Sequence, residues 1–182
     1  MTRSVVPGDP SSLSILGADA LRAGRQLQAD AQALASRRAD EAGGVDRTSS
    51  HEAGTPRVRK DLDQRTSSLI SATLLTAEEM LRIGRLFQER AAELSTAQHT
   101  LQGLRDRATA AGLGIDGSHV SLPWGITGSA DADVQAKRVA DRDHLQADLD
   151  RLQSSASTRR RALEREVKSS TAALTRIIEG LS

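Results

Sequence analysis

Apolar residues recur every seven positions through most of this 182-residue chain. The pattern is clearest at Met80, Phe87, Leu94, Leu101 and Ala108. Heptad spacing sustained over this length is typical of amphipathic helices that pack along a narrow seam. It predicts an all-α chain, organised as a helical bundle or coiled coil. The helices are expected over residues 12–41, 57–111 and 130–181.

The side chains available for these seams are mostly Leu and Ala. The chain contains one Trp, one Phe, no Tyr and no Cys. Because aromatic side chains contribute the largest buried areas, their scarcity predicts a thin bundle whose seams need a partner. The absence of Cys excludes disulfides and thiolate zinc sites.

The charges are nearly balanced, with 25 Lys and Arg against 24 Asp and Glu. A dedicated nucleic-acid or anionic-membrane binder usually carries a basic excess, so this balance argues against both classes. No run approaches the roughly 18 consecutive apolar residues of a transmembrane helix. The N-terminal residues lack the apolar core of an ordinary signal peptide. We therefore expect a cytoplasmic protein, with export by a route that reads a folded helical signal, without a cleaved signal peptide, as the open alternative.

Two polar, glycine-containing stretches separate the predicted helices. Residues 43–56 are expected to form a flexible linker. Residues 112–129, with five glycines, are expected to form a loop without strands. The two longer helices are nearly equal in length, which predicts an antiparallel hairpin around this loop. The shorter helix follows an irregular segment, 1–11, and the whole chain is expected to form a single helical domain, 1–182.

Three details of the helices have more than one interpretation. Ser11 or Ser12 is expected to be the N-cap of the first helix. The sequence that begins at Thr76 has the pattern of a capping box, which often starts a helix. A continuous helix is preferred there because the apolar period crosses this point in phase. Gly84 and Gly103 are either surface glycines or points of close helix approach, and both interpretations stay open.

No pattern typical of a catalytic site is present. The chain lacks a nucleophile elbow, a Walker A loop and a dinucleotide-binding loop. Asp141, His144 and Asp148 share one face of the third predicted helix and could hold a metal ion, but a solvated charged flank is the preferred interpretation. We therefore expect no enzymatic activity, no cofactor and no metal.

Arg159, Arg160 and Arg161 form the main basic run. One interpretation is contact with an acidic partner or with nucleic acid. The preferred interpretation is charge complementarity within the bundle. No aromatic residue interleaves with these arginines, so stacking on nucleic-acid bases is unsupported.

Trp124 is the only tryptophan and lies in the predicted loop 112–129. The preferred interpretation is an anchor for the loop, and the alternative adds a role in a partner-binding surface. A helix, a turn containing Trp124-Gly125 and a second helix of equal length resemble the WxG helical hairpins of type VII (ESX-like) secretion. The opening Val6-Pro-Gly-Asp-Pro10 is similar to the start of actinobacterial WxG-like N-terminal domains on secreted toxins.

The resemblance implies a helical partner or targeting protein, a chaperone or adaptor of a type VII-like system. Such a protein would pair with a WxG-type protein, or with the N-terminal helices of a toxin, through its apolar seams. The family's export signature is Tyr or His followed four residues later by an acid, and His144 and Asp148 have this spacing. The residues expected to bind the partner are Phe87, Leu94, Leu101, Trp124, Leu149, Leu163 and Leu174. The alternative is a self-associating structural coiled-coil protein, unrelated to secretion, that forms homo-oligomers.

Overall fold

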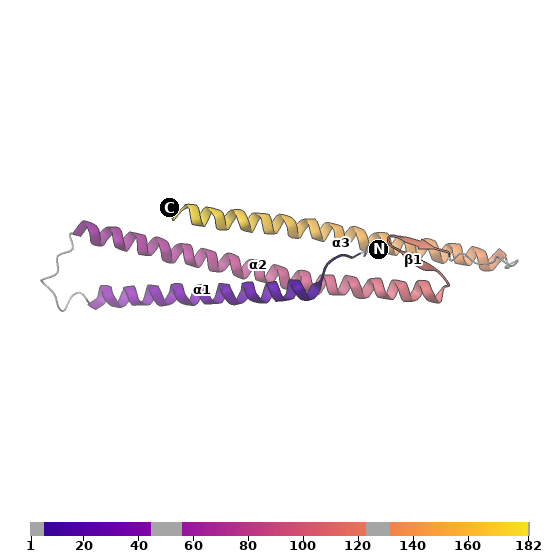
Figure 1. Cartoon of the computed structure of the whole chain (residues 1–182), viewed down its shortest axis with the longest axis horizontal. Helices are drawn as coiled ribbons and strands as arrows, with labels where there is room; N and C mark the ends of the chain where they lie inside the picture. Colours follow the sequence, from indigo (N-terminus) through magenta and orange to yellow (C-terminus); the bar gives the residue numbers. More distant parts are fainter. Residues whose placement is uncertain (1–5, 45–55, 123–131, 182) are drawn as a thin grey trace. The chain divides into compact units, whose positions relative to one another are not determined.

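The described part of the chain folds into three α-helices and one short β-hairpin (Figure 1). The computed structural model describes residues 6–44, 56–122 and 132–181. In chain order the elements are α1 (Pro10–Gly44), α2 (Pro56–Ala110), β1 (Gly114–Asp116), β2 (His119–Ser121) and α3 (Ala132–Glu179). The prediction of an all-α fold, with two long helices and a shorter N-terminal helix, is confirmed.

The observed helix boundaries differ from the predicted ones by a few residues. Helix α1 begins at Pro10, inside the segment predicted to be irregular, and ends at Gly44, inside the predicted linker 43–56. Helix α2 continues unbroken past Thr76, whose hydroxyl donates a hydrogen bond to the carbonyl of Ala72 at 2.8 Å. The preference for a continuous second helix is therefore confirmed.

Asp9 is the N-cap of α1, so the prediction of Ser11 or Ser12 was wrong. The Asp9 carboxylate accepts hydrogen bonds from the backbone N–H groups of Ser11 and Ser12, both at 3.1 Å, and from the Ser12 hydroxyl at 2.5 Å. Pro10 then occupies the first helical position, where a missing N–H leaves no helical hydrogen bond unmade. Pro10 therefore belongs to the helix, and the cap lies one residue before it.

The loop predicted without strands contains β1 and β2, so that prediction was also wrong. The two strands are antiparallel, with Ile115 opposite Val120, and Gly117 adopts a φ of +56° in the turn between them. Gln146 of α3 holds the hairpin, because its side chain accepts from the N–H of Val120 at 2.8 Å and donates to the carbonyl of Ser118 at 2.9 Å. Strands of three residues are too short for alternation to reveal them.

Helix α2 ends in a Schellman motif. The N–H of Leu113 donates to the carbonyl of Ala108 at 2.8 Å, and the N–H of Gly112 donates to the carbonyl of Thr109 at 3.0 Å. Gly112 has a φ of +68°, a conformation that disfavours side chains with a Cβ atom. The motif turns Leu113 back toward Ala108, and both side chains join one apolar cluster.

Packing divides the chain into two compact units. Unit 1 comprises Met1–Leu13 with Glu89–Glu164, and unit 2 comprises Ser14–Gln88 with Arg165–Ser182. Within unit 1, α2 and α3 run antiparallel, because Arg107 pairs with Asp148 while Glu93, earlier in α2, pairs with Arg159, later in α3. The organisation of residues 1–182 as a single domain stays a prediction.

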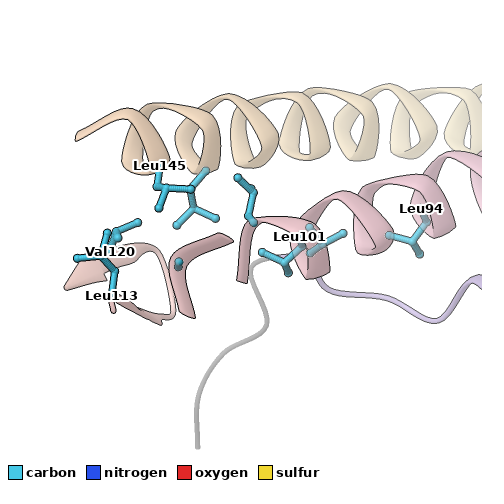
Figure 2. Close-up of a cluster of buried hydrophobic side chains, with 9 residues drawn as sticks. Leu94, Leu101, Leu113, Val120 and Leu145 are labelled. Carbon is cyan, nitrogen blue, oxygen red and sulfur yellow. The ribbon is translucent and has the colours of Figure 1, made fainter. Parts of the chain in front are cut away.

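Leucine and valine form the core of unit 1. Leu94 and Leu101 of α2 gather with Leu145 of α3 and with Leu113 and Val120 of the hairpin region (Figure 2). The other members of this cluster are Val6, Leu104, Ala108 and Leu149. Side chains from the N-terminal segment, both helices and the hairpin thus share one continuous core.

Alanine and glycine form the core of unit 2. Its buried apolar side chains, among the described residues, are Ala20, Ala31, Ala72 and Ala77. A Cβ atom added at Gly84 would lie 2.6 Å from Cγ of Leu21 and 2.9 Å from its backbone nitrogen. Gly17 and Gly24 of α1 lie equally close to α2. The small residues therefore allow the backbones of α1 and α2 to approach closely.

The two interpretations left open for the glycines of α2 are now resolved. Gly84 is a point of close helix approach. A Cβ added at Gly103 would meet nothing within 4 Å, so Gly103 is a surface glycine.

Candidate partner-binding surface

Large apolar side chains lie on the outside of unit 2. Leu69, Leu75 and Ile178 are 49%, 52% and 66% exposed, respectively. We call the exposed large apolar residues of this unit the outer apolar set, which comprises Ile15, Leu16, Leu34, Leu62, Leu69, Leu75, Ile178 and Leu181. In the described part of unit 1, only Val134 is comparably exposed. Unit 2 therefore carries nearly all of the uncovered large apolar surface.

Adjacent apolar residues explain part of this exposure. Neighbouring side chains on an α-helix point about 100° apart, so both members of a pair cannot face the same seam. Leu74 is half-buried while Leu75 is exposed, and Ile177 is half-buried while Ile178 is exposed. Each pair thus supplies one side chain to the unit's own packing and one to its surface.

Part of the outer apolar set lines an open groove of about 580 Å³ within unit 2. Ala72 and Leu75 of α2 line it on one side, and Ile177 and Leu181 at the C-terminal end of the chain line it on the other. Leu69 and Leu181 line an adjoining hollow. An apolar groove between two helices is suited to receive side chains of a further helix.

A polar cluster holds α2 against α3 within unit 2. The guanidinium of Arg82 donates to Glu79 and to Glu166, each at 2.7 Å, and also to the hydroxyl of the fully buried Ser170. The bonds to Glu79 and Glu166 raise the pKa of Arg82. The bonds from Arg82 and then Ser170 lower the pKa of Glu79. The cluster therefore keeps its charges at neutral pH, as a structural contact does.

The residues predicted to bind a partner fall in both units and differ in burial. In unit 1, the side chains of Leu94, Leu101 and Leu149 are buried and that of Leu163 is half-buried. In unit 2, the side chains of Phe87 and Leu174 are half-buried. Trp124 lies outside the described residues. The heptad pattern correctly placed the three buried leucines on a seam, but that seam is covered by this chain's own helices and hairpin. The outer apolar set was missed as a surface, although its adjacent pairs are visible in the sequence.

Of the three residues considered for a metal, Asp148 serves other contacts. Asp148 pairs with Arg107 at 3.1 Å and with Arg151 at 2.9 Å, and His144 is exposed. No group of three or more His, Cys, Asp or Glu side chains is placed to hold a metal ion in the described part of the chain.

The basic run makes pairs within unit 1. Arg159 lies 3.6 Å from a carboxylate oxygen of Glu93, and Nε of Arg160 donates to Glu164 at 2.9 Å. Arg161 is exposed and makes no hydrogen bond or ion pair with another described residue. Charge pairing within the bundle thus accounts for two of the three arginines.

Comparison with known proteins identifies no family for this chain: no family model, curated protein or solved structure matches it. Among the described helices, none has both the length and the apolar character needed to cross a membrane.

Proposed function

We propose that this protein is a non-enzymatic helical partner or targeting protein of a type VII-like secretion system. It would pair with a WxG-type protein, or with the N-terminal helices of a toxin, through the outer apolar set. The observation that carries this proposal is the reversed packing of unit 2, in which alanines are buried and leucines are exposed.

Covering these side chains gives the free energy for association. A Leu or Ile side chain contributes about 1.5–3 kcal/mol when it passes from full exposure to full burial. Leu69, Leu75 and Ile178 are half-exposed or more, so each still has a substantial part of this free energy available. A helix laid along the groove beside Leu75 would bury several of them together, as in helix-in-groove recognition.

The link to secretion comes from the resemblance at Trp124-Gly125 and at Val6–Pro10, and it is a proposal. His144 and Asp148 have the spacing of the family's export signature, but Asp148 is engaged by Arg107 and Arg151. We therefore propose that the partner supplies the export signal. The protein would act in the cytoplasm before any transfer.

Co-expression with WxG-type proteins encoded by neighbouring genes tests this function. A stable complex is expected to co-purify and to have a defined mass by light scattering. The double variant Leu69→Ser/Leu75→Ser should lose the complex, whereas Val134→Ser, which changes an exposed apolar residue of unit 1, should retain it. Circular dichroism should show the same helix content in all three proteins, since the substituted side chains are exposed.

The same experiment separates the alternative, a self-associating coiled-coil protein without a role in secretion. A homo-oligomer that dissociates in Leu69→Ser/Leu75→Ser, with no binding to any neighbouring gene product, would support that alternative. A stable monomer that binds none of those products would contradict both.

A further inference from the structure

Unit 1 contains a second concave site, separate from the outer apolar set. This cleft has a volume of about 390 Å³ and is lined by the N-terminal segment, α2 and α3. Its apolar lining comes from Val6, Leu13, Leu94 and Leu163. A smaller hollow of about 170 Å³ shares Val6 and Leu94 with it. The cleft is large enough to receive an aliphatic side chain of a ligand.

The charged residues that line the cleft and the hollow are mostly basic. Among the described residues they are Arg90, Arg159, Arg160 and Arg161, and the acids in the two linings are Glu93 and Glu164. Four guanidinium groups therefore face two carboxylates, and the rim carries an excess of positive charge.

The existing ion pairs leave part of this rim available. Arg90 is only 11% exposed, and it donates to Glu93 at 3.0 Å and to the carbonyl of Ala156 at 3.4 Å. Glu93 is shared with Arg159, and Glu164 is engaged by Arg160. Arg161 is exposed and has no ion pair with another described residue. The positive charge around Arg160 and Arg161 is therefore incompletely neutralised.

We propose that this cleft binds an acidic, amphipathic helical segment of the protein partner. An aliphatic side chain of that segment enters the cleft beside Leu94 and Leu163, and carboxylates one helical turn away pair with Arg160 and Arg161. Guanidinium groups bind carboxylates through two parallel hydrogen bonds, which favours this ligand class. Residues three or four apart share a helix face, so one segment can present both groups. An acidic protein segment is favoured over nucleic acid because no aromatic side chain is found among the described residues that line the cleft.

This inference rests on the proposed function, since it assigns a chemistry to the same partner. It also has a direct test that does not need the natural partner. The probe is a labelled synthetic peptide of about 15 residues, long enough for an isolated helix to be populated, with Leu and Glu three and four residues apart on one face. Binding to the full chain is measured by fluorescence anisotropy.

The double variant Arg160→Gln/Arg161→Gln should bind this peptide about tenfold more weakly, the combined effect of losing two exposed charge pairs. The matched control is Arg105→Gln/Arg138→Gln, which removes two exposed arginines of unit 1 away from the cleft and should leave binding unchanged. A peptide with Gln in place of Glu should bind the unmodified chain as weakly as the Glu peptide binds the cleft variant.

Several results would overturn the inference. The first is that the unmodified chain does not bind the peptide. The second is that the cleft and control variants lose the same amount of peptide affinity. The third is that the unmodified chain binds a single-stranded oligonucleotide tightly and the cleft variant does not. If a co-expressed partner needs Leu69 and Leu75 but binds the Arg160→Gln/Arg161→Gln variant normally, the proposed function stands and the cleft assignment fails. If the peptide binds the cleft and no neighbouring gene product co-purifies, the assignment stands and the proposed function fails.

Discussion

The two units of this chain use the same kinds of residue in opposite ways. Unit 1 buries leucine and valine, with Leu94 only 4% exposed and Leu149 completely buried. Unit 2 buries alanine and glycine and leaves Leu69 about half exposed and Ile178 66% exposed. When a region buries its large apolar side chains, the free energy of their transfer out of water stabilises that region's own fold. When a region leaves them exposed, part of this free energy can still be released on association with a partner. This difference in exposure is the reason for proposing unit 2 as the region that a partner covers.

The largest expected effect comes from the core of unit 1. Leu149→Ala should lower the free energy of unfolding by about 2–5 kcal/mol, because it removes a fully buried side chain and leaves a cavity. Leu69→Ala, the matched change in unit 2, should lower it by less than about 1 kcal/mol, because Leu69 is half-exposed. Urea unfolding followed by circular dichroism measures both changes. Equal losses in the two variants would contradict the contrast between the units.

The next effect tests the close approach of α1 and α2. Gly84→Ala should destabilise the protein by about 1–3 kcal/mol, because its Cβ would overlap the side chain and the backbone nitrogen of Leu21. Gly103→Ala should stabilise the same helix by up to about 1 kcal/mol, since Ala favours the helix and its Cβ enters open space. Thermal unfolding of the two variants provides the comparison. A stabilising Gly84→Ala would show that the helices are not in close contact.

A smaller effect is expected from acid. The pKa of Glu79 is lowered in the folded chain, so its contribution to stability is complete above its ordinary value of 4.5 and is lost as the pH falls through the folded value. The Glu79→Gln variant should therefore lose less stability between neutral and acidic pH than the unmodified chain. Glu78→Gln, a change at an exposed neighbour, serves as the control and should keep the steeper loss. Identical acid profiles for both variants would rule out a stabilising role for the Arg82–Glu79 contact.

The smallest effect is expected at the start of α1. Asp9→Ala should lower the melting temperature slightly, because Ala cannot accept the hydrogen bonds from Ser11 and Ser12. Asp9→Asn should retain most of the stability, since its side-chain oxygen can accept the same bonds. If Asn were as harmful as Ala, charge rather than capping would be the source of the stabilisation.

Helix positions followed directly from the sequence, while the hairpin and the cap did not. Heptad spacing is repeated many times within each helix, so one contrary signal, such as the capping-box pattern at Thr76, does not hide it. The hairpin depends on Gln146, a residue 26 positions beyond Val120, and no local pattern reports such a bond. The prediction of an irregular segment 1–11 leaves Pro10 outside the helix, although proline is well suited to the first helical position.

The candidate surface was harder to predict than the fold. Leu69 and Leu94 both lie in the helix predicted over residues 57–111, yet one is 49% exposed and the other 4%. A heptad position indicates which face of a helix a residue occupies, but it does not state whether another element covers that face. The adjacent pair Leu74-Leu75 carried the missing information, because two large neighbours cannot both enter one seam.

The hairpin also bears on the order in which the chain acquires its structure. The bond between Val120 and Gln146 spans 26 residues, whereas the bond between Arg82 and Ser170 spans 88. Closing a shorter loop costs less chain entropy, so we expect contacts around β1 and β2 to form early and the α2–α3 contacts of unit 2 to form late. The groove lined by Leu75, Ile177 and Leu181 lies between these helices and would then form late. During synthesis, an incoming helix would have the longest time to engage that groove.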